Sequence, residues 1–151
     1  MKEIGDLGEQ LVSRWLELHD YQILQRNWRC RWGEIDIVAQ DKTNEMIAFV
    51  EVKTRSDRNW DEDGLLALND SKQQKLIQTA SLFLAKHPKL AELPCRFDLG
   101  LVSYQLLRPK SDSTINFGSQ IALVERLEIN QAIIIGCYRL NINQYLESAF
   151  D

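Results

Sequence analysis

The stretch from Gly33 to Arg55, GEIDIVAQDKTNEMIAFVEVKTR, constrains the fold more than any other part of the chain. Its pattern predicts two neighbouring strands, at residues 34–40 and 46–55, joined by a polar turn. Period-two alternation predicts that one set of side chains in the first strand shares a face and that a second set lies on the opposite face. The first set is Ile35, Ile37 and Ala39, and the second is Glu34, Asp36 and Val38.

The second strand is apolar on both faces, which is typical of a strand that is covered on both sides. Glu51 and Lys53 interrupt it, and because they are two residues apart they lie on the same face. An unpaired charge is costly to bury, so these groups need a partner, a metal ion or an open cleft. If the two strands pair as a hairpin, Asp36 lies beside Glu51 on that face, with Cβ atoms about 4.5–5.5 Å apart.

Two carboxylates at that separation repel each other unless a proton or a cation lies between them. Mg²⁺ suits them because it takes oxygen ligands and fills its other positions with water and substrate phosphate. Lys53 would orient or deprotonate the attacking water, or stabilise the charge that develops on phosphorus. The three residues therefore predict a phosphodiester hydrolase. The alternative is that Glu51 and Lys53 pair with counter-charges at a sheet edge.

Residues 3–19 have helical periodicity, with an apolar stripe that would face a core. Gly5 and Gly8 lie inside this helix, where glycine is unfavourable. Either the helix packs closely on a sheet there, or bulk is excluded because a ligand passes. Glu9 lies beside the apolar stripe, either as a solvated residue at its border or as an acid that faces the site.

Residues 21–30 alternate weakly and predict a further strand, which ends in a cluster of arginine and tryptophan. The cluster consists of Arg26, Trp28, Arg29, Arg31 and Trp32. It has two interpretations. The arginines contact phosphates while the tryptophans stack on bases, or the arginines pair with acidic neighbours while the tryptophans pack in the core.

The rest of the chain predicts a mixed α/β domain whose central sheet carries helices on its faces. A second helix begins near Asn69, with Ser71 and Gln74 as a capping box, places Gln73 on its buried side, and stops before Pro88. The remaining predictions are an acidic loop at 56–64, a strand at 95–105 that contains Asp98, a loop at 108–118, a strand pair at 120–129 and 132–140, and a closing helix at 142–150.

Composition fits one ordinary globular domain, residues 1–151, with 44% hydrophobic and 26% charged residues. The net charge of −4 lacks the basic signature of many nucleic-acid binders. Cys30, Cys95 and Cys137 form neither a disulfide framework nor a metal-binding pair, which favours a reducing compartment. With no signal sequence at the start and no apolar run long enough to span a bilayer, we expect a cytoplasmic protein without a membrane partner.

Several motifs occur here in order, and together they resemble those of one family. They are Gly5-x-x-Gly8-Glu9, Arg26-Asn27-Trp28-Arg29-Cys30, Gly33-Glu34-Ile35-Asp36-Ile37, Phe49-Val50-Glu51-Val52-Lys53-Thr54-Arg55, Lys72-Gln73, Cys95-Arg96-Phe97-Asp98 and Ala149-Phe150. The chain looks like a member of the bacterial YraN family of small uncharacterised proteins. That family is similar in fold to restriction endonucleases and to archaeal Holliday-junction resolvases, the PD-(D/E)xK nucleases.

The resemblance implies a restriction-endonuclease-like three-layer core, a central mixed β-sheet flanked by helices, with an insertion at residues 106–140. It implies that Asp36, Glu51 and Glu9 bind Mg²⁺ or Mn²⁺, and that Lys53 is the catalytic lysine, with Gln73 nearby. For Glu34 and Asp98 we favour structural ion pairs over supporting roles in the site. The implied nucleic-acid contacts are Arg26, Trp28, Arg29, Arg31 and Lys72.

The implied function is a metal-dependent nuclease that acts on DNA, including branched or junction DNA. By analogy, a two-fold homodimer would suit a four-way junction. Two other functions stay open at this stage: a non-catalytic nucleic-acid-binding or scaffold protein that keeps the nuclease fold, and a metal-dependent hydrolase of another phosphoester.

Overall fold

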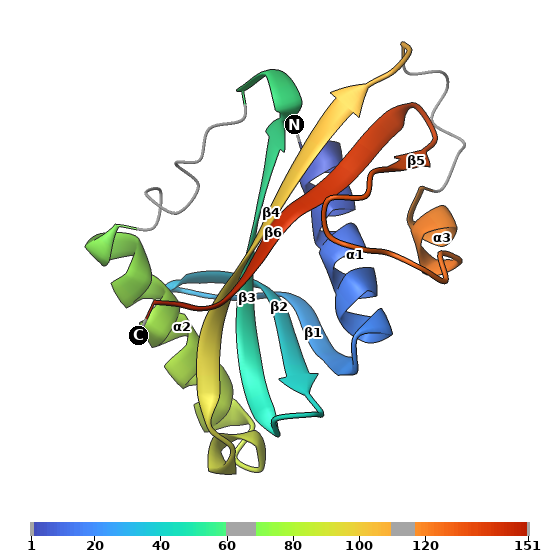
Figure 1. The fold of residues 1–151 in the computed structure, drawn as a ribbon. Coiled ribbons are helices and arrows are strands. Elements are labelled where there is room, and N and C mark those ends of the chain that lie inside the picture. Colours follow the sequence, from blue (N-terminus) through green and yellow to red (C-terminus); the bar gives the residue numbers. More distant parts are fainter. Residues whose placement is uncertain (1, 60–68, 110–116, 151) are drawn as a thin grey trace.

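The computed structural model describes residues 2–59, 69–109 and 117–150. Within these residues, three α-helices accompany a six-stranded sheet with the order β1-β2-β3-β4-β6-β5 (Figure 1). The elements are α1 (Lys2–Leu18), β1 (Tyr21–Cys30), β2 (Gly33–Asp41), β3 (Met46–Ser56), η1 (Asp57–Asn59), α2 (Asp70–Lys86), η3 (Leu90–Glu92), β4 (Cys95–Leu106), α3 (Phe117–Ala122), β5 (Ile133–Ile135) and β6 (Tyr138–Phe150). The predicted α/β class is confirmed.

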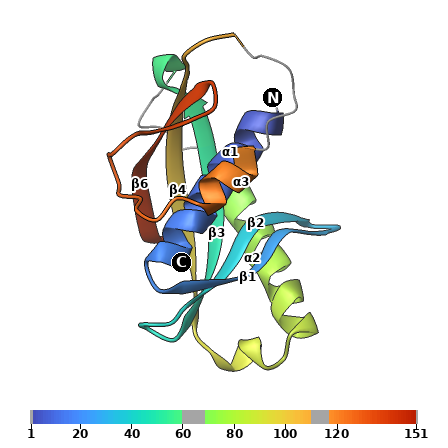
Figure 2. The same cartoon turned by 90° about the vertical axis from the view of Figure 1, so that its right-hand side faces the viewer.

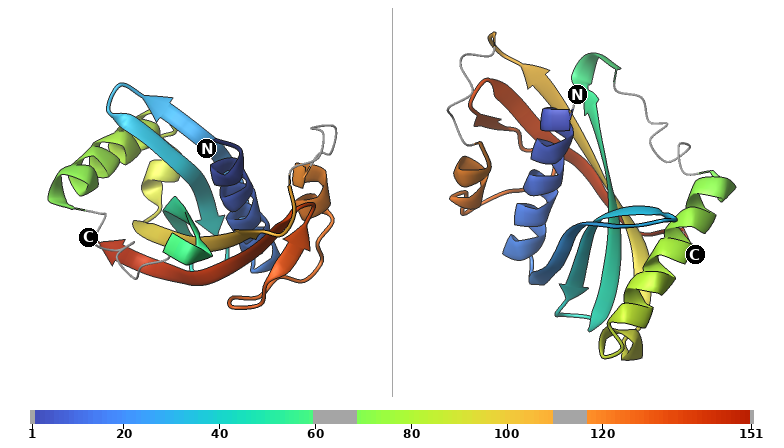
Figure 3. Two further views of the ribbon diagram at one scale, coloured as in Figure 1. Left: turned by 90° about the horizontal axis from the view of Figure 1, so that it is seen from above. Right: turned by 180° about the vertical axis from the view of Figure 1, so that it is seen from behind.

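The sheet is mixed because a single parallel pair lies at its centre. Strands β1, β2 and β3 form an antiparallel meander, whereas β3 and β4 are parallel and are connected through α2. A parallel connection needs such a crossover, since the chain must return to the end of the sheet where it started. The strand β6 then pairs antiparallel with β4. Helices α1 and α3 lie on one face of the sheet and α2 lies on the other (Figures 2 and 3).

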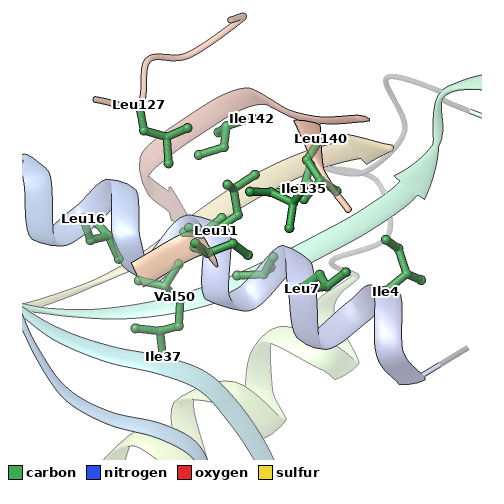
Figure 4. Close-up of a cluster of buried hydrophobic side chains, with 14 of the residues drawn as sticks. Ile4, Leu7, Leu11, Leu16, Ile37, Val50, Leu127, Ile135, Leu140 and Ile142 are labelled. Atoms are coloured by element: carbon green, nitrogen blue, oxygen red, sulfur yellow. The ribbon is translucent and has the colours of Figure 1, made fainter. Parts of the chain in front are cut away.

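The apolar stripe predicted for the first helix forms one side of the larger core. Ile4, Leu7, Leu11 and Leu16 point from α1 toward side chains of β2, β3 and the C-terminal segment (Figure 4). On the opposite face of the sheet, Phe83 of α2 packs in a second core with apolar residues of β2 and β3.

Gly8 marks the closest approach of α1 to the sheet. A Cβ atom at this position would overlap Oγ1 of Thr54 on β3 and would lie 3.2 Å from its Cβ, whereas a Cβ at Gly5 would meet nothing within 4 Å. Of the two explanations for these glycines, close helix–sheet packing therefore holds at Gly8. The contact fixes where the next residue, Glu9, lies over the sheet.

The predicted cap of the second helix is wrong. The N-cap is Asn69, whose side chain accepts a hydrogen bond from the backbone N–H of Lys72, while Ser71 lies inside the helix. The backbone of Asn69 has an extended conformation, as is typical of an N-cap residue. The helix stops before Pro88 as predicted. Residues 60–64 of the predicted acidic loop lie outside the described residues.

The predictions for the C-terminal third hold only in part. The strand predicted at 132–140 corresponds to β5 and the start of β6, and residues 110–116 of the predicted loop lie outside the described residues. Two predictions are wrong: residues 120–129 do not form a strand, because α3 occupies 117–122, and residues 142–150 belong to β6 in place of a closing helix. The tertiary structure explains β6: it pairs with β4 from Leu106↔Tyr138 to Phe97↔Phe150 and covers an edge that would otherwise be open.

The alternation predicted for the first strand of the hairpin holds only in part. Ile37 and Ala39 pack in the core beneath α1, but Ile35 packs with Val38 in the core beneath α2. The faces therefore exchange around Asp36. The β2–β3 pairing begins at Ile37↔Val50, so Asp36 lies where the two strands separate.

Candidate active site

Asp36 fills the gap between the separating strands β2 and β3. Its side chain is buried, and its Oδ2 accepts a hydrogen bond of 2.8 Å from the backbone N–H of Val52. Burial raises the pKa of Asp36 to about 8, and the nearby carboxylates of Glu51, Glu9 and Glu34 add to this effect. The carboxyl group is therefore neutral near pH 7 unless a cation compensates its charge.

Three carboxylates from two elements converge at this point. Glu9 of α1 and Glu34 and Asp36 of β2 each offer an oxygen, and these oxygens lie within 4.8 Å of one another. Glu34 reaches the group because it is two residues before Asp36 on the same strand. Glu9 reaches it because Gly8 lets α1 lie directly on β3.

Glu9 has an unusual environment for an acid. Only 13% of its side chain is exposed, and the Arg26 guanidinium lies 3.9 Å from Oε1, which is too far for a hydrogen bond. Oε1 is buried and accepts no hydrogen bond. Burial raises the pKa of Glu9 to about 7, although the positive charge of Arg26 opposes the shift. A buried carboxylate oxygen without a donor is the atom that a cation would satisfy.

Glu51 and Lys53 form a pair beside this group. Their side chains are each about one-fifth exposed, and Nζ of Lys53 lies 3.4 Å from Oε1 of Glu51. Burial raises the pKa of Glu51, while Lys53 and, more weakly, Lys72 lower it. The charge of Glu51 also contributes to raising the pKa of Asp36. The sequence predicted Asp36, Glu51 and Glu9 as the metal ligands. Among the described residues, the three convergent carboxylates are instead Glu9, Glu34 and Asp36.

The convergent oxygens fit a hard divalent cation. Carboxylates are the preferred protein ligands of Mg²⁺ and Mn²⁺, and one or two of them are enough for Mg²⁺. A divalent charge would also compensate the groups whose pKa values are raised, because a nearby positive charge favours the ionised form. Glu9, Glu34 and Asp36 are thus the residues placed to hold such an ion.

An open pocket of about 250 Å³ adjoins the carboxylates. It lies between the tip of the β1–β2 hairpin, β3 and the first half of α2. Its lining is Trp32, Gly33, Glu34, Glu51, Lys53, Lys72, Lys75, Leu76 and Thr79. Gln73 is half-buried in the same turn of α2 but does not line this pocket.

The arginine–tryptophan cluster divides between the two interpretations. Nε of Arg29 lies 2.7 Å from Oε2 of Glu34, and Trp28 packs edge-to-face on Phe83 with ring centroids 5.4 Å apart. With Arg26 facing Glu9, these three residues have partners within the chain. Arg31 and Trp32 differ, because the Arg31 guanidinium lies over a Trp32 ring that is 41% exposed.

Asp98 has the structural role that the sequence favoured. It accepts hydrogen bonds from Arg96 at 3.0 Å, from the hydroxyl of Tyr145 at 2.6 Å and from the backbone of Ser148 at 3.0 Å. Arg96 in turn bonds Asp41 at 3.0 Å. This buried network fastens β4 to β6 and to the end of β2.

Comparison with known proteins shows the family. The model of the family described as "Uncharacterised protein family UPF0102" matches residues 8–102, a range that includes every candidate site residue. The chain belongs to the UPF0102 family. This is the YraN family that the motifs indicated.

UPF0102 proteins of cyanobacteria are similar to the chain over most of its length. One from Acaryochloris marina is 47% identical over 98% of this chain and 90% of its own length. One from Synechocystis is 44% identical over 99% of both chains, and one from Thermosynechococcus vestitus is 51% identical over 70% of this chain and 84% of its own length. Within the described parts of the chain, no helix is both long and apolar enough to cross a membrane.

Three residues of the site were not predicted from the sequence: Glu34, Trp32 and Lys75. Glu34 was assigned to an ion pair, and the Arg29 pair does exist, but Glu34 also belongs to the convergent carboxylates. Its spacing of two residues from Asp36 was the available signal. Trp32 was noted only as a member of a cluster. Its position two residues before Glu34, at the predicted turn, was the signal that it would lie next to the site.

Proposed function

We propose that this UPF0102 protein is a metal-dependent nuclease that hydrolyses phosphodiester bonds in DNA. The observation that carries the proposal is the convergence of Glu9, Glu34 and Asp36 within 4.8 Å, beside the Lys53–Glu51 pair and an open pocket. Arg29 pairs with Glu34, but the pKa values of Glu9 and Asp36 are raised, and two buried acids with so little compensation are destabilising without a function. The order of one helix, three antiparallel strands, a crossover helix and a parallel strand supports our further proposal of a restriction-endonuclease-like core.

The residues have distinct roles in this proposal. Glu9, Glu34 and Asp36 hold Mg²⁺ or Mn²⁺, and Val52 fixes the orientation of Asp36 through its backbone N–H. When bound, the ion would polarise a phosphoryl oxygen of the substrate and lower the pKa of a water molecule that it binds. Lys53 donates a hydrogen bond to the attacking water or to a non-bridging oxygen, and Glu51, 3.4 Å away, holds its ammonium group in place.

The positive side chains around the pocket support a phosphate-containing substrate. Lys72 and Lys75 of α2 line it together with Lys53. Because a net acidic chain gains little from non-specific counterion release, we propose that affinity for DNA is concentrated at this local surface. We extend the proposal to a cytoplasmic protein that meets DNA, including branched DNA, as a two-fold homodimer.

The test is cleavage of linear, flap and four-way-junction DNA by purified protein with Mg²⁺, Mn²⁺ or EDTA. Wild type should cleave at least one substrate only with metal, and Asp36→Asn or Lys53→Met should reduce the rate at least 100-fold. Glu92→Gln, which removes an exposed carboxylate from η3, is the control and should cleave normally. Cleavage that persists in Asp36→Asn contradicts the assigned site. DNA binding without cleavage by any combination of substrate and metal favours a non-catalytic scaffold instead.

A further inference from the structure

The tip of the β1–β2 hairpin is held in a fixed place above α2. Cys30 pairs with Gly33, so Arg31 and Trp32 are the two residues of the turn. Gly33 has φ of +150°, a conformation that L side chains rarely adopt. A Cβ atom there would lie 3.5 Å from Oγ1 of Thr79, which shows that the tip contacts α2. Trp32 is therefore presented from a short, supported turn.

Trp32 is an exposed aromatic residue that contributes to neither hydrophobic core. Its side chain is 41% exposed, and it packs in neither core beneath the helices. The Arg31 guanidinium lies 4.6 Å from the ring centroid and covers one face. In the described part of the chain no aromatic ring stacks on Trp32, and the ring lines the pocket beside the carboxylates.

The other side chains that line this pocket are suited to a nucleotide, because they place positive charge for a phosphate near the aromatic ring that would contact a base. Glu51 and Lys53 of β3 lie beside the convergent carboxylates, and Lys72 and Lys75 add positive charge from α2. Aromatic platforms combined with cations are how proteins bind single-stranded DNA, because every base has a face that stacks and every nucleotide has a phosphate. A volume of about 250 Å³ accommodates one nucleobase.

We propose that Trp32 stacks on an unpaired nucleobase adjacent to the scissile phosphate, and that the preferred substrate is DNA with an unstacked nucleotide there. The inference rests on the proposed nuclease function. In regular duplex DNA both faces of each base are covered by its neighbours, so stacking on Trp32 requires a single strand, a flap or a branch point. Arg31 favours the stacked arrangement because its guanidinium already covers the other face of the ring.

The test measures affinity separately from cleavage. Fluorescence anisotropy in EDTA gives the Kd for labelled single-stranded DNA and for blunt duplex DNA of the same length. Trp32→Ala should weaken single-strand binding about 10-fold, Trp32→Phe should retain most of the affinity, and duplex binding should change less than about 2-fold. Ile134→Ala is the control, because Ile134 is 64% exposed on β5, at the opposite edge of the sheet. Circular dichroism should confirm that each variant is folded.

Three results overturn the inference: equal loss of single-strand and duplex affinity in Trp32→Ala, equal loss in Trp32→Phe and Trp32→Ala, or no single-strand binding by wild type. Failure of the nuclease proposal gives a different pattern. In that case no DNA is cleaved with any metal, while the Trp32-dependent preference for single strands persists. If only the stacking inference is wrong, the protein still cleaves DNA with metal and Asp36→Asn still abolishes cleavage. In that case Trp32→Ala does not change which DNA substrates are preferred.

Discussion

Asp36→Asn should make the metal-free protein more stable at neutral pH. Burial and three neighbouring carboxylates raise the pKa of Asp36 from 3.8 to about 8, so the folded state at pH 7 must hold a proton that the unfolded chain releases. The amide of the variant is neutral at every pH. Its oxygen can still accept the hydrogen bond from the Val52 N–H, which is 2.8 Å long in the wild type. The substitution therefore removes a cost and keeps the contact.

The direction and size of this stability change follow from the pKa values of Asp36 in the unfolded and folded states. Because the folded-state pKa is raised, the wild type has no penalty below about pH 4, and the penalty grows as the pH rises toward 8. Each pH unit across this window contributes about 1.4 kcal/mol. The full value at pH 7 is about 4 kcal/mol, and relaxation of the site reduces it, so we expect a gain of about 1–3 kcal/mol. For a chain of this size that corresponds to an increase in Tm of roughly 3–10 °C.

The assay is thermal unfolding followed by circular dichroism, in EDTA, at about pH 4.5, 6 and 7.5. The variant should match the wild type at the lowest pH and exceed it progressively at the higher values. Saturating Mn²⁺ should raise the Tm of the wild type but not that of the variant. Asp41→Asn, the same chemical change at a paired carboxylate, should destabilise and serves as the contrast. A lower Tm for Asp36→Asn in EDTA at pH 7.5, or an equal gain at every pH, would refute the reasoning.

Gly8→Ala should lower the free energy of unfolding by about 1–3 kcal/mol in urea titrations, while Gly5→Ala should leave it unchanged or raise it by up to about 1 kcal/mol; equal effects would contradict the close approach of α1 to β3. Asp41→Asn should cost about 2–4 kcal/mol at pH 7, because it leaves a buried guanidinium with one partner fewer. Hydrogen bonds from Asn44 and Arg96 lower the pKa of Asp41 despite its burial, so this contribution is present at neutral pH and is lost as the pH falls; a cost that stays constant on acidification would be the wrong result. Glu9→Gln and Glu34→Gln should each weaken Mn²⁺ binding at least about 10-fold by calorimetry, and unchanged affinity in either variant would remove that residue from the ligand set.

The first two-thirds of the fold could be predicted from local pattern. The stripe on α1, the apolar run of β3 and the stop before Pro88 depend on neighbours in the sequence, and all three are confirmed. The strand β6 could not be predicted in this way. Ile142, Leu146 and Phe150 recur every four residues, which is the spacing of a helix, yet the segment is a strand because it pairs with the edge of β4.

The site shows the same division between local and long-range information. The anomaly of Glu51 and Lys53 within an apolar strand, and the hairpin that brings Asp36 near them, were visible in the sequence. The membership of Glu34 in the carboxylate group was visible only in part. Its spacing of two residues places it on the same face as Asp36, but the convergence of both with Glu9 depends on the position at which α1 crosses β3, which no spacing within β2 reports.

Two groups of buried carboxylates in the described parts of the chain, considered together, support the functional assignment of one of them. Asp41 and Asp98 are buried, and each bonds the guanidinium of Arg96 at 3.0 Å; the hydrogen bonds to Asp41 lower its pKa. Glu9 and Asp36 are also largely buried, yet their pKa values are raised, and Oε1 of Glu9 has no hydrogen-bond donor. Arg96 thus compensates the structural carboxylates of Asp41 and Asp98, whereas the charges of Glu9 and Asp36 are compensated only in part. An electrostatic cost concentrated beside an open pocket, in a fold that pairs its other buried acids, is what a site for a divalent cation requires.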